Sequence, residues 1–535
     1  MLLGMALAGC QSGPQSSGEP DGLTASLSSK YDAIIYGATI SGIMAAYRLY
    51  KNGLSACILE PTRDIGGATA AGLVWTDLPK DIRALSGLTL SHFYGGISSA
   101  YGLRDPVFAF EPRVAKTVAA DLLARSGTHV RTSTRIRGAQ DLEMRGGRVH
   151  GIRAGEKWIS AKFFIDASYE GDLMAAAGVP YDVGRDSFAD YGEPMAGYQP
   201  DAVTVTPPAF SNTRVFPFTA DPKSVAGERD GKVQAFNFRA VLSTHDSRLP
   251  FPKPPGYDPR DFLSFRQYMD FVNSKNPNPK FRIDGLSSLL QNTYKIPNGK
   301  LATNQGEGFF GFDLPGASWP YPDGGWDVRD SVIEQHLNWQ QGLFYWLCNE
   351  KSLPESVRKD SLRYGLPVDE FASSQFGHGF PHSIYVREGR RMKGKYILTA
   401  HDLIGANTSK STSVAWWKYP LDSHLVQYFG VTDSAAAGEG WIPLHYQNSV
   451  DNYEIPAECI IPPDGNIANM AVPVCMSASR TAYMSSRMEP LFGMLGEASG
   501  ELAAQSIKTG RDVQLFDYRR LASSMRAYGS SITVP

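Results

Sequence analysis

The chain has 535 residues, a formal net charge of −2 at pH 7 and 20% charged residues. This length allows two or three domains, and a near-neutral charge without a basic run argues against nucleic acid or an anionic membrane surface as the main partner. The five cysteines include no Cys-x-x-Cys pair, so the sequence predicts no metal site.

The N-terminal segment, residues 1–30, is a short apolar stretch followed by a polar tether. The apolar stretch ends in Leu-Ala-Gly-Cys at Cys10, which resembles a bacterial lipoprotein signal, and it is too short to span a membrane as a helix. We predict that Cys10 is lipidated and that the protein is exported to the periplasmic face of a bacterial membrane, with the lipid anchor as its only membrane contact. The alternative is an apolar, flexible N-terminus without export.

An apolar strand, a glycine turn, a helix of small residues and a second strand follow one another over residues 31–60. A helix start of this kind offers free backbone N–H groups and the positive end of the helix dipole to a pyrophosphate, and an acid about 20 residues later accepts hydrogen bonds from ribose hydroxyls. The pattern predicts a dinucleotide site, with an ordinary strand–turn–helix–strand unit as the alternative. The expected contacts are Gly37, Thr39, Ser41, Gly42 and Glu60.

A glycine pair, Gly66 and Gly67, follows the acidic strand end. A pair at this place resembles the FAD version of the dinucleotide fold, in which the backbone passes close to the diphosphate and ribityl chain. A domain that binds only NAD does not need it. The pair therefore predicts FAD as the cofactor.

The rest of residues 31–185 completes the first part of the predicted FAD-binding domain. We expect a helix over 112–125, a strand over 127–133 that brings Val130 to the cofactor, and three strands near 136–144, 149–154 and 157–164. Glycine turns between the last three predict a β-meander. Its last strand delivers Asp166 and Ala167, which in glutathione-reductase-like FAD proteins return to the cofactor.

Residues 186–424 show no second dinucleotide pattern and are rich in proline and aromatic residues. We predict an inserted α+β substrate domain, with its clearest helix over 327–347. Residues 425–525 are expected to return to the FAD-binding domain.

The predicted C-terminal helix carries three glycines, Gly493, Gly496 and Gly500, on one face. Each interior glycine costs about 1 kcal/mol relative to alanine, so the stripe indicates close packing against the sheet or the cofactor. We expect the helix start, with Arg487, Glu489 and Gly493, to face the flavin, where its positive end would stabilise the anionic reduced ring. Packing alone is the alternative.

Taken together, the motifs resemble the bacterial FAD-dependent oxidoreductase family, some members of which carry the name xanthan lyase. The resemblance implies FAD, redox chemistry and an α/β fold: a Rossmann-like FAD-binding domain of the glutathione-reductase type with a β-meander, plus the inserted substrate domain. It does not supply a substrate. The segments that carry it include 37–42, 65–67, 72–77, 166–173, 234–239, 381–391, 422–424 and 487–490.

Hydride transfer to flavin N5 from an alcohol needs a base for the hydroxyl proton. His382 is the first choice and His424 the second, because histidine suits proton transfer near neutral pH. Arg387 could bind a substrate carboxylate or oxygen, Tyr385 could donate to a substrate oxygen, and Asp77 could be a base or a loop-capping acid. A structural role is the alternative for each.

We therefore predict an FAD-dependent dehydrogenase or oxidase that acts on a small polar organic donor, with a hydroxylated or carbohydrate-like compound as the leading candidate. The electron acceptor stays open among oxygen, a quinone and a partner protein. Two other functions are kept: a non-redox lyase or glycosidase with a bound dinucleotide, and a lipid-anchored glycan-binding protein.

Overall fold

The structure is a computed structural model that describes residues 28–199, 204–206, 225–275, 278, 282–290, 294–306, 311–405, 408–432 and 435–535. Cys10 lies outside these residues, so its lipidation and the export of the protein stay predictions. Among the described residues, no helix is both long enough and apolar enough to cross a membrane.

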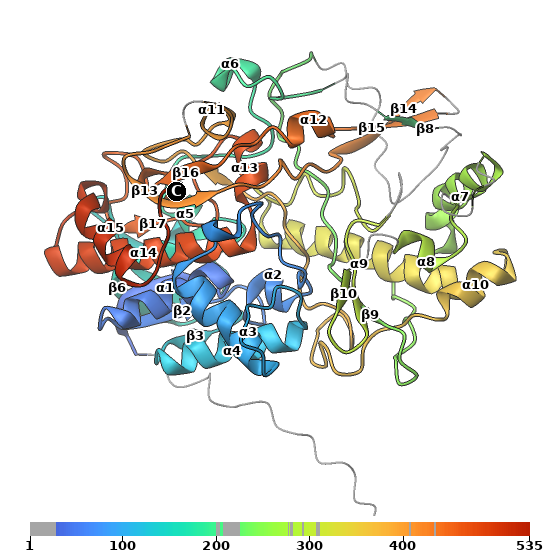
Figure 1. The fold of residues 1–535 in the computed structure, drawn as a ribbon, viewed down its shortest axis with the longest axis horizontal. Helices are drawn as coiled ribbons and strands as arrows, with labels where there is room; N and C mark the ends of the chain where they lie inside the picture. Colours follow the sequence, from blue (N-terminus) through green and yellow to red (C-terminus); the bar gives the residue numbers. More distant parts are fainter. Residues whose placement is uncertain are drawn as a thin grey trace, which may run out of the picture.

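A central mixed sheet matches the predicted Rossmann-like fold with its β-meander (Figure 1). The parallel strands include the expected β1 and β2, and the antiparallel meander runs from β4 to β6, with its first strand starting later than predicted, at Leu142. A short strand from the C-terminal part of the chain pairs in parallel with β6. The strand order is β3 (His129–Arg131), β2 (Ala56–Leu59), β1 (Lys30–Tyr36), β6 (Lys157–Asp166), β5 (Arg148–Ala154) and β4 (Leu142–Arg145), with β17 (Met470–Ala471) beside β6.

Helices α1 (Ile40–Lys51) and α14 (Glu489–Thr509) lie side by side, although they come from opposite ends of the chain (Figure 1). The glycine stripe of α14 explains how they approach so closely. A Cβ on Gly500 would lie 2.6 Å from the Ala45 carbonyl oxygen of α1, and one on Gly493 would lie 2.7 Å from Thr89 Cγ2. The stripe therefore serves helix packing, with Gly493 against Thr89, and the predicted cofactor contact of Gly493 stays a prediction.

The long helix α9 (Trp326–Asn349) leads from the sheet into a second hydrophobic core (Figure 1). Trp339 and Phe344 are buried there, as an apolar helix face requires. Around it lie α7 (Leu263–Lys275), α8 (Leu286–Leu289), α10 (Glu355–Ser361) and a sheet of β10 (Tyr294–Ile296), β11 (Lys300–Ala302) and β9 (Val241–Ser243).

The remaining elements are short, apart from helix α4, which was predicted over 112–125. The helices are α2 (Gly67–Ala70), α3 (Gly95–Ala100), α4 (Pro112–Arg125), α5 (Asp172–Ala176), α6 (Phe188–Tyr191), α11 (Ala400–Leu403), α12 (Leu444–Gln447), α13 (Arg480–Ser486) and α15 (Tyr518–Ala527). The strands are β7 (Tyr181–Asp182) with β12 (Arg391–Met392), β13 (Ser413–Trp417) with β16 (Tyr453–Pro456), and β8 (Thr204–Thr206) with β14 (Gln427–Thr432) and β15 (Ala435–Glu439).

Candidate functional site

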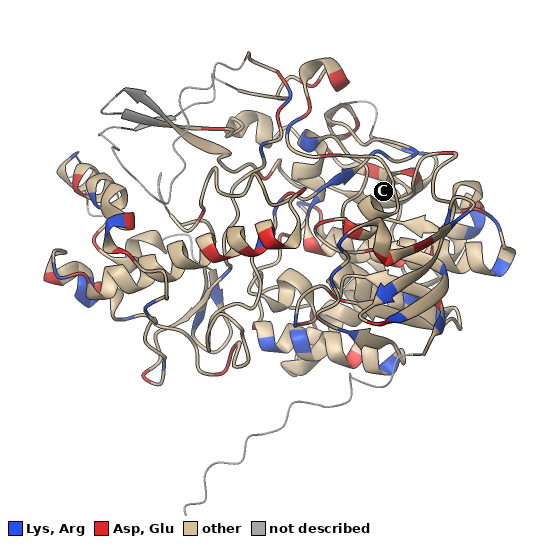
Figure 2. Ribbon diagram, turned by 180° about the vertical axis from the view of Figure 1, so that it is seen from behind, with Lys and Arg blue, Asp and Glu red and all other residues tan. Residues whose placement is uncertain are grey.

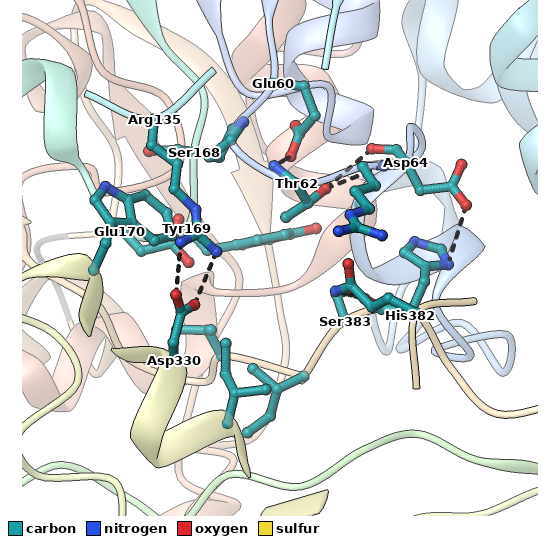
Figure 3. A pocket seen from close by; sticks show the side chains of 18 of the residues that line it. Glu60, Thr62, Asp64, Arg135, Ser168, Tyr169, Glu170, Asp330, His382 and Ser383 are labelled. Carbon is teal, nitrogen blue, oxygen red and sulfur yellow. Dashed lines mark hydrogen bonds and ion pairs between the residues drawn. The ribbon is translucent and has the colours of Figure 1, made fainter. Parts of the chain in front are cut away.

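A cavity of about 690 Å³ lies at the carboxyl ends of β1, β2 and β6, the edge where open α/β sheets bind their ligands (Figure 3). The sheet side supplies the glycine turn and the acidic strand end. The opposite wall is the N-terminal half of α9, which carries several acidic residues (Figure 2). The residues that line it include Gly37, Thr39, Glu60, Gly67, Tyr169, Asp330, Glu334 and His382.

Thr39 builds the turn that starts α1. Its hydroxyl accepts a hydrogen bond from Gly42 N–H at 3.2 Å and donates one to the Ala167 carbonyl at 2.8 Å, so threonine here caps the helix and ties it to the end of β6. Gly37 has a φ of 105°, and a Cβ there would lie 2.7 Å from the Ala167 backbone. The Gly42 N–H is thus taken by Thr39, and the other first-turn N–H groups have no intrahelical acceptor and suit phosphate oxygens.

Gly42 and Ser41 do not line the cavity. A Cβ on Gly42 would lie 2.0 Å from the Gly37 carbonyl oxygen, so this glycine lets the helix pack against its own turn. The buried Ser41 hydroxyl has no hydrogen-bond partner in the part of the chain that the structure describes.

Glu60, at the end of β2, lines the cavity. One carboxylate oxygen accepts from Ala38 N–H at 2.6 Å and the other from Thr62 N–H at 2.7 Å, which leaves each oxygen a further lone pair for a ribose hydroxyl. Burial raises the pKa of Glu60 to about 7. The free N–H groups and this acceptor suit the adenosine diphosphate part of FAD.

Two predicted cofactor residues are not among those that line the cavity. Val130 is buried within β3, and Ser133 and Arg135, just beyond that strand, line the cavity instead. The Asp166 carboxylate accepts from Met174 N–H at 2.8 Å and from Ser168, so it closes the turn after β6. Burial raises the pKa of Asp166 to about 7.

Arg135 crosses from the sheet side to α9. Its guanidinium makes two hydrogen bonds to the Asp330 carboxylate, at 2.7 and 2.8 Å (Figure 3). This bidentate pair closes one side of the cavity.

Tyr169 joins the glycine pair to the start of α14. Its hydroxyl donates to Glu489 at 2.8 Å and accepts from Ala68 N–H at 2.9 Å, and a Cβ on Gly67 would lie 2.5 Å from it. Burial raises the pKa of Glu489 to about 7, and its second oxygen is without a partner among the described residues. Three segments that the sequence assigns to the cofactor therefore meet at Tyr169.

Tyr385 is the centre of a second group of buried charges. Arg487 donates to its hydroxyl at 3.0 Å, and the guanidinium carbons of Arg239 and Arg387 lie 4.7 and 5.4 Å from its ring centroid. We call the whole group the Tyr385 cluster; it contains Asp77, Arg239, Asp313, Tyr385, Arg387, Asp422, His424 and Arg487.

A chain of ion pairs runs through this cluster. Asp422 contacts Arg487 at 2.7 Å and His424 Nε2 at 3.3 Å, and Asp313 contacts His424 Nδ1 at 3.0 Å and Arg387 at 3.0 Å. Burial alone would raise the pKa of Asp422, but Arg487 and His424 hold it well below its usual range. Both nitrogens of His424 face carboxylates, so this predicted base has no free nitrogen for a substrate.

Asp77 is the acid of the cluster that keeps one oxygen atom, Oδ2, without a hydrogen-bond partner among the described residues. The Tyr419 hydroxyl donates to its Oδ1 at 2.8 Å. Burial and the charge of Asp422 raise the pKa of Asp77. These are the properties of a proton acceptor that works closer to neutral pH than an ordinary aspartate.

The other predicted base, His382, belongs to the cavity and not to the cluster. Its Nδ1 lies 3.5 Å from Asp64, which follows Glu60 on the nucleotide side (Figure 3). Lys116 also contacts Asp64. Burial lowers the pKa of His382. The two histidines therefore occupy different sites.

The family comparison decides the assignment. A family model described as "FAD dependent oxidoreductase" matches residues 32–525. The chain belongs to this family. The enzyme is thus an FAD-dependent oxidoreductase, its cofactor is FAD, and the α/β Rossmann-like fold expected from the sequence is confirmed.

Solved structures share parts of this oxidoreductase at low identity. Thioredoxin reductase from T. acidophilum is 18% identical over 26% of this chain and 35% of its own, with a TM-score of 0.17. THI4 from Thermovibrio ammonificans is 22% identical over 30% of this chain and 67% of its own, with a TM-score of 0.22. L-amino acid deaminase from Proteus vulgaris is 17% identical over 31% of this chain and 54% of its own, with a TM-score of 0.23. The match thus spans only part of these chains, and the search of curated proteins found none that matches.

Proposed function

We propose that this FAD-dependent oxidoreductase oxidises a small polar donor with a hydroxyl group, which binds at the Tyr385 cluster. When bound, FAD accepts the hydride that leaves the donor carbon. The observation that carries the proposal is the position of Arg487. It contacts Tyr385 and Asp422 and comes two residues before Glu489, which Tyr169 connects to the nucleotide cavity.

Tyr385 and Tyr169 belong to one small apolar cluster with Ala68 and Leu73. This contact joins the donor side to the glycine-pair segment of the cavity. The donor is thereby held beside the residues that would hold the inner part of FAD, as hydride transfer requires.

Asp77 accepts the donor's hydroxyl proton in this proposal. Its raised pKa and its unoccupied oxygen suit a general base. His424 positions Asp422 and Asp313, and His382, which lines the cavity, would help to hold the cofactor. The base role thus passes from the two histidines to the aspartate.

Anaerobic mixing of the purified holoenzyme with a panel of sugars, polyols and hydroxy acids tests the proposal. We expect one class to bleach the visible flavin band, with photoreduction as the control that the flavin can be reduced. Consumption of a compound without bleaching would favour a lyase or glycosidase, and binding without turnover would favour a glycan-binding protein. Readmitting oxygen or adding a quinone then tests the electron acceptor.

We further propose, from the Leu-Ala-Gly-Cys motif, that the protein is a periplasmic lipoprotein anchored through Cys10. Incorporation of labelled palmitate tests this. The label should be lost in Cys10→Ser, and an unlabelled wild-type protein would contradict the proposal.

A further inference from the structure

Arg239 differs from the other arginines near Tyr385. Arg387 contacts Asp313 at 3.0 Å, and Arg487 contacts Asp422 at 2.7 Å. Arg239 makes no ion pair with any carboxylate in the part of the chain that the structure describes. It is only 7% exposed. Asp77 and Asp313 act on it electrostatically but make no direct ion pair with it, and a buried guanidinium without a paired carboxylate is unfavourable. The position therefore calls for an anion.

The guanidinium of Arg239 is held in place, but not all of its N–H groups have a hydrogen-bond acceptor among the described residues. It lies 4.7 Å from the Tyr385 ring centroid, and Nη1 donates to Asn304 Oδ1. Its Nε is buried and has no acceptor among the described residues. The Arg239 carbonyl packs on Gly72, where a Cβ would lie 1.7 Å from the oxygen, so the loop that leads to Asp77 fixes this residue.

A second unsatisfied polar atom lies close by. Asn237 donates from Nδ2 to Asp313 at 2.8 Å, while its Oδ1 is buried without a partner in the described residues. An acceptor beside an unpaired guanidinium suits a ligand that presents an anionic group together with a hydroxyl donor.

We propose that Arg239 binds the carboxylate of the donor, so that the substrates are hydroxy acids, sugar acids included. The oxidation of the hydroxy acid rests on the proposed function, whereas the binding of its carboxylate to Arg239 does not. The C–H bond of the hydroxyl-bearing carbon breaks and its hydride passes to FAD, the hydroxyl proton passes to Asp77, and a C=O bond forms. The donor is oxidised by two electrons to an oxo acid, and FAD is reduced.

Matched ligands test the carboxylate directly. Lactate, glycerate and gluconate are compared with propane-1,2-diol, glycerol and glucose by thermal shift and by perturbation of the flavin spectrum in the holoenzyme. We expect at least one acid to bind while its neutral partner does not. Arg239→Gln should weaken that binding by about 10- to 100-fold, and Arg239→Lys by less, because it keeps the charge. Arg248→Gln, at a half-buried arginine outside the Tyr385 cluster, is the control.

Several outcomes would overturn the proposal. These are equal binding of acids and neutral partners, equal acid binding by Arg239→Gln and wild type, or a preference for inorganic phosphate over every acid. A shifted flavin potential in Arg239→Gln with unchanged acid binding would show that this arginine serves the flavin. If acids bind through Arg239 but none bleaches the flavin, the proposed function fails while the anion site stands.

Discussion

Gly496 of α14 lies directly against Ser41 of α1: a Cβ on Gly496 would stand 2.1 Å from the Ser41 carbonyl oxygen. Ser41 belongs to the first turn of α1, which follows the Thr39 cap at the cavity. The C-terminal helix therefore fixes the turn that is to hold the cofactor phosphates, and no side chain larger than hydrogen fits at position 496.

Gly496→Ala should separate α14 from α1. Overpacking of this kind costs about 1–3 kcal/mol, and we expect a lower free energy of unfolding in urea together with weaker FAD binding, because the Thr39 turn moves. Gly231→Ala is the matched control, since a Cβ there has no neighbour within 4 Å. Equal unfolding curves for the two variants would show that α14 does not constrain α1.

Glu60→Gln should weaken FAD binding by about tenfold or more, because a side-chain NH₂ would face one of the backbone donors, Ala38 N–H or Thr62 N–H, and acceptors for the ribose would be lost. FAD titration of the apoprotein measures it. Glu143→Gln, on the surface strand β4, controls for the loss of a carboxylate. An unchanged FAD dissociation constant would remove Glu60 from the cofactor site.

The flavin reduction rate should fall as pH falls through the raised pKa of Asp77. Burial and Asp422 raise this pKa, and only the deprotonated carboxylate accepts a proton, so the rate is highest on the alkaline side. The rate should begin to fall at a pH above the usual pKa range of aspartate. Stopped-flow measurement of flavin reduction over a series of pH values tests this. A reduction rate that stays constant toward acid pH, with FAD fully bound, would argue against an aspartate base.

Buried Glu497 should make stability depend on pH. Its carboxylate accepts from Thr89 N–H at 2.6 Å and Leu88 N–H at 2.9 Å, yet burial raises its pKa from 4.5 to about 7. The folded protein thus holds this proton more tightly, so the contribution is full below 4.5 and lost as pH rises to about 7. Over that range the unfolding free energy of the wild type should fall relative to that of Glu497→Gln; a rise relative to the variant would contradict the assignment.

The local parts of the fold could be predicted from the sequence. Glycine spacing and apolar periodicity indicate the first βαβ unit, the helix over 112–125 and the meander, because neighbouring residues determine them. The direction of single side chains could not be predicted in the same way. Asp166 turns toward its own loop, where it accepts from Met174 N–H, and the face of Gly493 that lacks a side chain lies against Thr89 of a distant segment.

The Tyr385 cluster has no local signature. Its members range from Asp77 to Arg487, and only tertiary structure brings them together. The sequence indicates His424 and Arg387 as site residues, but it does not indicate the carboxylates with which they form ion pairs. Arg239 lies within the motif 234–239, and nothing in the sequence shows that it would make no direct ion pair with a described carboxylate.

Single-turnover reduction of two variants, each saturated with FAD, tests most directly where the donor reacts. Asp77→Asn should keep FAD but slow reduction by about 100-fold or more, as loss of a general base does. His382→Asn should lower FAD affinity but reduce at the wild-type rate once loaded. The reverse pattern, with slow reduction in His382→Asn and wild-type reduction in Asp77→Asn, would place the chemistry in the cavity and contradict the account.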